Sequence, residues 1–150
     1  MLLGWLSGIA WNQTSKRGGS DVPPAARTQQ PRSVNLAPEV RQLFRRIEQA
    51  LSSGSIEAIA SEFSPSVMLS IQREEPGVYS SGQSASILIN YFLSRKPLSF
   101  VFSRFGEQTA TPYATGRLSF VQKGSRETAQ VYVSLRRMGS RWRIHQFNIY

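Results

Sequence analysis

The chain contains one histidine, His145, within its last twelve residues, GSRWRIHQFNIY. Imidazole exchanges a proton readily near neutral pH, so His145 is the first candidate for acid–base chemistry. Period-two alternation puts His145 on the same face of a terminal strand as Arg141 and Arg143, while the opposite face carries the apolar side chains of Trp142 and Ile144. This pattern favours a polar, structural position over a pocket base.

The apolar residues that follow complicate this alternation. Phe147 and Ile149 have the same parity as His145, although apolar side chains belong on the face of Ile144. Two explanations fit the pattern. Either a bulge after Ile144 resets the two faces, or both faces of the strand are covered, as in a dimer.

Carboxylates are the other candidates for acid–base work. The only aspartate, Asp21, lies in a linker-like region. We expect the glutamates on helix surfaces (Glu39, Glu48, Glu57, Glu62) or at turns (Glu74, Glu75, Glu107), with Glu127 paired to an arginine across a hairpin. None faces inward by pattern, so no general base can be assigned. One histidine and no cysteine also exclude a usual transition-metal site, and we predict no metal and no cofactor.

Basic residues form the strongest compositional bias, with 18 Lys and Arg against 9 Asp and Glu. Arginines concentrate in the last three expected strands, and a basic sheet face is predicted from Arg117, Arg136, Arg141 and Arg143. Such a face, with Tyr132 among the arginines, can bind single-stranded nucleic acid by phosphate contacts and stacking. The outer face of an antiparallel sheet is normally polar, however, so nucleic-acid binding is the weaker interpretation.

The elements that must position these residues begin after a dissimilar leader. Residues 1–37 combine a short apolar run, MLLGWLSGIAW, with a stretch rich in Pro, Gly, Ser and charge, which predicts a disordered leader and linker. The apolar run is too short to span a bilayer, so the protein is not predicted to be transmembrane. It has the length of a signal-peptide core, and small residues at Gly8 and Ala10 suit cleavage. We therefore expect an exported, periplasmic protein, with a cytoplasmic one as the alternative.

Three helices are expected within a domain at residues 38–150. Pro38 suits a first turn, and an apolar stripe follows it at helical spacing: Val40, Leu43, Phe44, Ile47 and Leu51. A second, short helix capped by Ser55 buries Ile56, Ile59, Ala60 and Phe63 and stops before Pro65. A third starts with the capping-box spacing of Ser80 and Gln83 and carries Ile87, Leu88, Tyr91 and Phe92.

Strand periodicity occupies most of the remaining sequence. One strand is expected at 67–71 and a brief one at 78–79, and four longer ones follow Pro97. Tight turns at Lys123-Gly124-Ser125 and Met138-Gly139-Ser140 indicate hairpins, and hairpins imply antiparallel neighbours. The predicted fold class is therefore α+β, with three helices packed on one face of a strongly bent antiparallel sheet.

This order of elements resembles the nuclear transport factor 2-like fold, also called cystatin-like, in which a bent sheet wraps the helices into a cone with a pocket at its wide end. Gly139-x-x-Trp142-x-Ile144 resembles the last hairpin and strand of that fold. From about Val40 onward the chain is similar to an uncharacterised, typically exported bacterial group, a domain of unknown function (the 4783 family). The stretches that carry this similarity are IEQALSSGSIEAIASEF with PSVMLSI, GVYSSGQSASILINYFL and RWRIHQFNIY.

The resemblance implies a fold and no particular chemistry, because the superfamily includes enzymes as well as binding and interaction domains. The leading hypothesis is a non-enzymatic ligand-binding or protein-interaction domain with a mainly apolar pocket for a small apolar ligand or a peptide. The alternatives are an isomerase, dehydratase or hydrolase that uses the pocket, with His145 or a glutamate as base, and weak nucleic-acid binding.

Aromatic and aliphatic side chains are the candidate walls of that pocket. They are Phe44, Phe63, Leu88, Tyr91, Phe92, Phe100, Phe102, Phe120 and Trp142. Each also fits an ordinary core position, because aromatic stripes commonly pack the fold. The same sheet also suits a homodimer.

Overall fold

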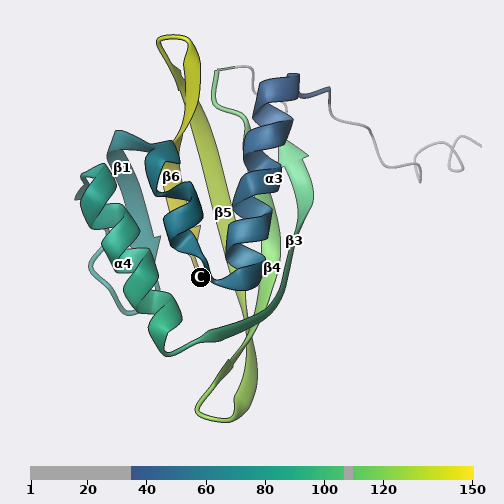
Figure 1. Cartoon of the computed structure of the whole chain (residues 1–150), viewed down its shortest axis with the longest axis vertical. Coiled ribbons are helices and arrows are strands. Elements are labelled where there is room, and N and C mark those ends of the chain that lie inside the picture. The colour runs from purple at the N-terminus through teal and green to yellow at the C-terminus, as the bar shows by residue number, and fades with distance from the viewer. Residues whose placement is uncertain (1–34, 107–109) are drawn as a thin grey trace, which may run out of the picture. The chain divides into compact units, whose positions relative to one another are not determined.

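A computed structural model describes residues 35–106 and 110–150, with element labels as in Figure 1. In chain order the elements are helix α3 (Pro38–Ser53), the 3-10 helix η2 (Ile56–Glu62), strands β1 (Phe63–Ile71) and β2 (Gly77–Tyr79), helix α4 (Ser81–Leu93), and strands β3 (Lys96–Gly106), β4 (Tyr113–Gln122), β5 (Ser125–Met138) and β6 (Arg141–Ile149). The predicted leader lies outside the described residues except for its last three, so its disorder and its role in export stay predictions.

Helix α3 forms as the sequence predicts. Pro38 occupies its first turn, and Gly54 ends it in the left-handed conformation, with φ 77°. The Gly54 N–H donates to the carbonyl of Ala50, which satisfies one of the last orphan carbonyls of the helix. The predicted apolar stripe is confirmed, since the buried residues of α3 are Val40, Leu43, Phe44, Ile47, Ala50 and Leu51.

The second helix differs from the expectation in type and in length. It is a 3-10 helix, and Ser55 makes no side-chain capping hydrogen bond. Phe63 is the first residue of β1 rather than the last buried residue of the helix, and Pro65 lies inside that strand. The helix ends at Glu62 because the chain there turns extended to join the sheet, a tertiary pairing that local sequence does not encode.

Helix α4 has the predicted capping box. The N–H of Gln83 donates to Oγ of Ser80 at 3.1 Å, and the N–H of Ser80 donates to Oε1 of Gln83 at 3.1 Å. Both bonds satisfy N–H groups at the start of the helix, which fixes where α4 begins. Of its predicted stripe, Leu88, Tyr91 and Phe92 are buried, whereas Ile87 is half-buried.

The sheet has six strands in the order β2-β1-β6-β5-β4-β3. The hairpin pairs are antiparallel as predicted, but β1 pairs in parallel with β6, so the sheet is mixed. The expectation of a wholly antiparallel sheet is therefore wrong at this one pairing. Turn signals determine the direction of strands that are consecutive in the chain, whereas β1 and β6 come from opposite ends of the domain and meet only in the folded state.

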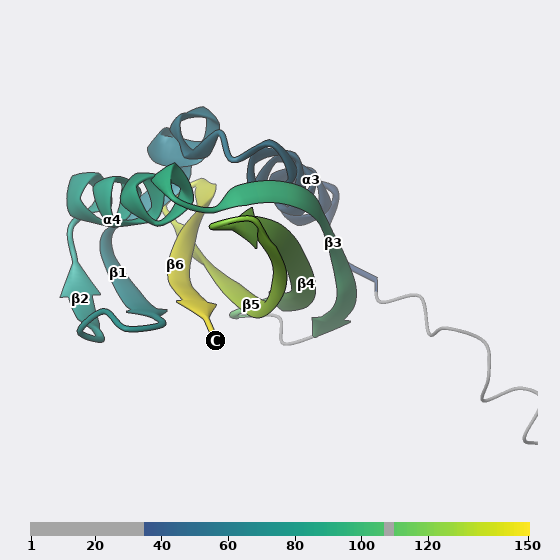
Figure 2. The same ribbon diagram turned by 90° about the horizontal axis from the view of Figure 1, so that it is seen from below.

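The helices all cover one face of this sheet. Figure 2 shows the sheet curving from β2 at one edge to β3 at the other, with α3, α4 and the intervening short helix on its concave side. Side chains on that side are buried, whereas those that alternate with them on β4 are half-buried or exposed. The α+β fold class, with three helices on one face of a strongly curved sheet, is confirmed.

A bulge resets the faces of β6 at His145. In the pairing with β5, Ile144 lies opposite Leu135 and Gln146 lies opposite Ser134, so His145 is an extra residue. Beyond it, Phe147 and Ile149 are buried together with Ile144. The first of the two explanations for the alternation is confirmed.

Aromatic side chains that contact each other occupy part of the space between the helices and the sheet, together with aliphatic ones. The ring of Phe44 lies 5.4 Å from that of Phe102, and Phe102 lies 4.8 Å from Phe100, in edge-to-face arrangements. Between α4 and β4, the Tyr91 ring lies 6.3 Å from that of Phe120. These distances are those of packed aromatic pairs, so this part of the concave side is core.

Helix α3 also covers the free edge of β3. The carboxylate Oε2 of Glu48 accepts the backbone N–H of Phe102 at 2.8 Å, and Oγ of Ser52 donates to the carbonyl of Phe100 at 3.0 Å. An edge strand exposes unpaired backbone groups, and here side chains of a helix satisfy two of them. Glu48, expected on a helix surface, is therefore half-buried and has a structural role.

Candidate functional site

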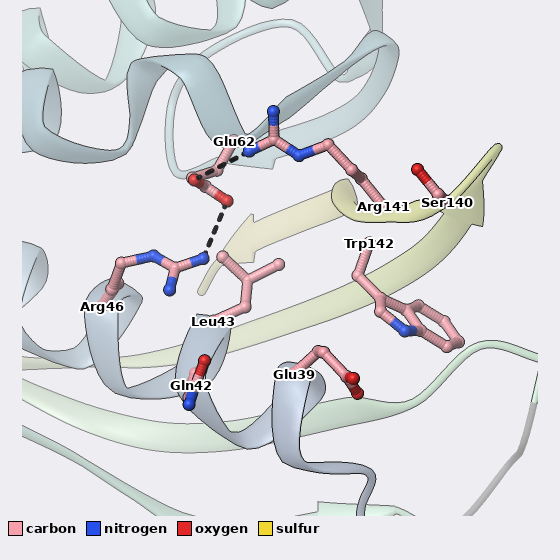
Figure 3. Close-up of a pocket in the computed structure, with 8 residues that line it drawn as sticks. All are labelled: Glu39, Gln42, Leu43, Arg46, Glu62, Ser140, Arg141 and Trp142. Atoms are coloured by element: carbon pink, nitrogen blue, oxygen red, sulfur yellow. Dashed lines mark hydrogen bonds and ion pairs between the residues drawn. The ribbon is translucent and has the colours of Figure 1, made fainter.

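A cleft of about 190 Å³ lies where the first turns of α3, the end of η2 and the turn between β5 and β6 meet. Figure 3 shows the side chains around it, with Arg46 and Arg141 reaching Glu62 from two sides. We call it the Glu62 cleft, and it is lined by Glu39, Gln42, Leu43, Arg46, Glu62, Ser140, Arg141 and Trp142.

The carboxylate of Glu62 is buried at the bottom of this cleft. Its side chain is 11% exposed, against 48% for that of Arg46 and 62% for that of Arg141. Oε2 lies 3.2 Å from Nη2 of Arg46, a hydrogen bond, and Oε1 lies 4.0 Å from Nη2 of Arg141, an ion pair beyond hydrogen-bond distance. Charges that are buried in proteins are normally paired in this way.

The sequence reasoning that put Glu62 on a helix surface is wrong, because η2 is not an α-helix. A 3-10 helix has three residues per turn, so positions three apart lie on one face. The buried residues of η2 are Ile56, Ile59 and Glu62, which are spaced by three. This spacing was the available signal: a glutamate continues the row of two isoleucines.

A third arginine holds the end of η2 to the sheet. Nη1 of Arg143, from β6, donates to the backbone carbonyl of Ser61. Together with the contacts of Arg46 and Arg141 to Glu62, this ties the last turn of η2 to both α3 and β6. The carboxylate is therefore positioned by contacts from the preceding helix α3 and from β6, the last strand of the chain.

The arrangement is suited to binding more than to proton transfer. Both carboxylate oxygens of Glu62 face a guanidinium group and one of them accepts a hydrogen bond from Arg46, so the carboxylate already has charged partners within the protein. Each guanidinium carries several N–H donors in a planar fork, and Glu62 takes only one hydrogen bond from Arg46. Unused donors therefore remain on both guanidinium groups, in a cleft whose lining also includes the indole of Trp142.

His145 lies outside the residues that line this cleft. It is half-buried at the β6 bulge, and burial together with the positive charge of Arg136 lowers its pKa below the usual value. A lowered pKa keeps the ring neutral near pH 7. The structure thus places the histidine and the buried carboxylate of Glu62 at separate positions.

The nine predicted pocket-wall residues lie mostly in the core. Eight of them are 9% exposed or less, and Trp142 is half-buried against the core. Of the nine, Trp142 lines the Glu62 cleft, and Phe63 lines a shallow depression near Arg143. A ligand contact at the remaining seven stays a prediction: Phe44, Leu88, Tyr91, Phe92, Phe100, Phe102 and Phe120.

The four arginines of the predicted basic face lie in different environments. Arg141 pairs with Glu62, and Arg143 binds the carbonyl of Ser61. Arg117 lies on the helix-free face of β4, beside Val101 and Gln130. Arg136 is on β5, where it lies opposite Arg143 of β6 in the strand register. The sequence alternation alone did not reveal that two of the four turn toward η2.

In residues 35–106 and 110–150 there is no group of three or more His, Asp or Glu side chains that could hold a metal ion. None of the helices described is long and apolar enough to cross a bilayer.

Comparison with known proteins places this architecture in a family. Residues 44–150 match the model described as Domain of unknown function (DUF4783). The solved structure of a DUF4783 family protein from Bacteroides uniformis aligns with a TM-score of 0.63 and 18% identity, covering 70% of this chain and 93% of that one. No curated protein matches the sequence.

Two other solved structures extend the likeness to the wider fold. A protein of unknown function with a cystatin-like fold from Nostoc punctiforme aligns with a TM-score of 0.54 and 14% identity, over 74% of this chain and 86% of that one. An NTF-2 like protein of unknown function from Shewanella oneidensis gives 0.55 and 13%, over 74% and 95%. At such identities the structures share the fold alone. Because the family match runs from α3 to the last residue, the chain belongs to the DUF4783 family, and its fold is nuclear transport factor 2-like.

Proposed function

We propose that this chain is a non-enzymatic binding domain whose recognition site is the Glu62 cleft. The observation that carries the proposal is a buried carboxylate flanked by two much more exposed guanidinium groups, in a cleft that is also lined by a half-buried indole. A few convergent polar groups beside an apolar surface are typical of a small-molecule site. A cleft of about 190 Å³ suits a small ligand better than a folded partner.

The proposal moves the ligand from the interior of the curled sheet to its end. The interior was the expected pocket, but Phe44, Phe100 and Phe102 pack there against each other at contact distances. A ligand in that position would have to displace core side chains, which is costly. Trp142 belongs both to the predicted wall and to the cleft, and it links the two hypotheses.

Catalysis, the alternative, has less support from the same geometry. A general base must be free to take a proton from a bound substrate. Glu62 is engaged by Arg46 and Arg141, and His145 does not line the cleft. Binding requires neither group to change its protonation state.

Nuclear magnetic resonance on the full chain tests the proposal. Titration with a set of small neutral and charged fragments should shift the signals of the cleft residues, including the indole N–H of Trp142. Arg141→Ala should weaken those shifts, whereas Arg117→Ala, on the other face of the sheet, should leave them unchanged. Shifts confined to the helix-free face, or no shift with any fragment, would contradict the proposal.

Export and dimerisation complete the proposed function. The apolar run at 1–11, with small residues at Gly8 and Ala10, supports export, and N-terminal sequencing of secreted material would test it.

A homodimer through the helix-free face of the sheet is supported by exposed apolar side chains there, such as Val101 at 62%. A monomer at high concentration in sedimentation equilibrium would exclude the dimer.

A further inference from the structure

The Glu62 cleft has more hydrogen-bond donors than its own carboxylate uses. Arg46 gives one hydrogen bond to Glu62, and Arg141 approaches no closer than 4.0 Å. Within the described residues, no other hydrogen bond or ion pair engages either guanidinium group. A second anion would therefore find unused N–H donors on both sides of the cleft.

The relative exposure of Glu62 and of the two arginines determines which charge an entering molecule meets first. The carboxylate of Glu62 is at the bottom, and the two guanidinium groups are several times more exposed. Glu39, the other acidic residue of the lining, is exposed and lies at the end of the cleft where Trp142 is drawn in Figure 3, away from both guanidinium groups. At the end of the cleft that contains Glu62, an incoming ligand thus meets two cations before it reaches that carboxylate, which favours an anion there.

The shape of these groups narrows the class of anion further. A guanidinium fork matches a planar carboxylate with two parallel hydrogen bonds. Trp142, which is half-buried, adds an aromatic surface to the lining of the same cleft. A small molecule with a carboxylate and a flat apolar part would use both kinds of surface.

We propose that the Glu62 cleft binds small carboxylic acids with an aromatic or flat apolar body, and that Arg46 and Arg141 clamp the carboxylate. This inference rests on the proposed binding function and adds the chemical class of the ligand. Glu62 acts as an internal competitor: it holds both arginines in place in the empty site and limits the affinity for a second carboxylate.

Three probes of nearly equal shape test the sign of the charge: benzoate, benzamide and benzylammonium. Replacing Trp5 and Trp11 by Phe leaves Trp142 as the single tryptophan, and its fluorescence and indole N–H signal then report the cleft. We expect benzoate to bind most tightly and benzylammonium most weakly. Added salt should weaken benzoate binding, because part of the attraction is between exposed charges.

Substitutions give the sharper test. Arg46→Gln and Arg141→Gln should each weaken benzoate binding by about fivefold, and Glu62→Gln should strengthen it by about fivefold, the size expected for one partly screened charge. Arg45→Gln removes an equal charge from an exposed position of α3 outside the cleft lining and should change little. Thermal unfolding of each variant checks that it is folded.

The possible outcomes separate the two proposals. If benzylammonium binds best and Glu62→Gln abolishes its binding, the cleft recognises cations and the carboxylate inference is wrong, while the binding function stands. Equal binding of all three probes would also overturn the inference, because charge then plays no part. If no probe of any charge changes the Trp142 signals, the proposed site itself fails.

Discussion

Two glutamates that contact α3 or project from it have opposite roles. At the β3 edge, Glu48 accepts a backbone N–H from Phe102, and its partner is a fixed part of the sheet. At the end of η2, Glu62 pairs with Arg46 and Arg141, whose side chains are largely exposed. A carboxylate bonded to the backbone is committed to the fold. One held by exposed cations leaves those cations available to another anion.

The largest effect on stability is expected from adding a side chain at Gly116, which lies on β4 where that strand pairs with β3. A Cβ added to Gly116 would collide with the carbonyl of Val101 and lie 2.8 Å from the Phe100 ring. Gly116→Ala should therefore lower the free energy of unfolding by about 3 kcal/mol, the upper part of the range for overpacking. Urea unfolding measures this.

A second glycine provides the control for that measurement. Gly82 lies in α4, and a Cβ there meets no atom within 4 Å. Gly82→Ala should raise the free energy of unfolding by about 0.5 kcal/mol, because alanine is the better helix former. Equal effects of the two substitutions would show that the close approach of β3 and β4 is unimportant.

Removing the carboxylate at the β3 edge comes next in size. Glu48→Ala leaves the partly buried N–H of Phe102 without its acceptor and should cost about 2 kcal/mol. Glu48→Gln keeps a carbonyl acceptor and should cost less than half of that. Neither variant should alter benzoate binding at Trp142. A loss of binding would mean that the two regions are coupled.

The corresponding change at the cleft should be milder. Glu62→Gln removes an ion pair whose cationic partners are largely exposed, so we expect a loss of about 1 kcal/mol. A double-mutant cycle with Arg46→Gln would measure the pairwise term directly. A cost above that of Glu48→Ala would reverse the comparison and make Glu62 mainly a structural residue.

The smallest effect concerns pH and a third region, the β6 bulge. The folded pKa of His145 lies below its usual value near 6.5, so protonation favours the unfolded chain. The free energy of unfolding should therefore decrease slightly as the pH falls from about 7 to about 5. His145→Gln should abolish this part of the slope. An unchanged slope would assign it to other groups.

The local sequence pattern was sufficient to predict where a helix begins or ends when capping residues mark that end. The capping box at Ser80 and Gln83 and the glycine after α3 both form as the sequence predicts, because each satisfies backbone groups of its own helix. The bulge at His145 was also one of two explanations that the sequence allowed. In each case the residues that decide the structure are neighbours in the chain.

The candidate site was less predictable, because it depends on contacts between elements rather than on neighbours in the chain. Trp142 was among the predicted wall residues, but Glu62 was placed on a surface, and Arg141 was assigned to an open basic face. Their contact requires that η2 is a 3-10 helix and that α3 and β6 meet at its end. Neither condition follows from periodicity.

By itself the sequence determined helices α3 and α4, the hairpin strands and their order, and the family resemblance, since periodicity and turn chemistry act over a few residues. Tertiary structure alone decided that β1 runs parallel to β6, that packed aliphatic and aromatic side chains occupy the interior, and that a glutamate lies buried between two arginines. These features depend on contacts between residues far apart in the chain, for which a single sequence contains no direct signal.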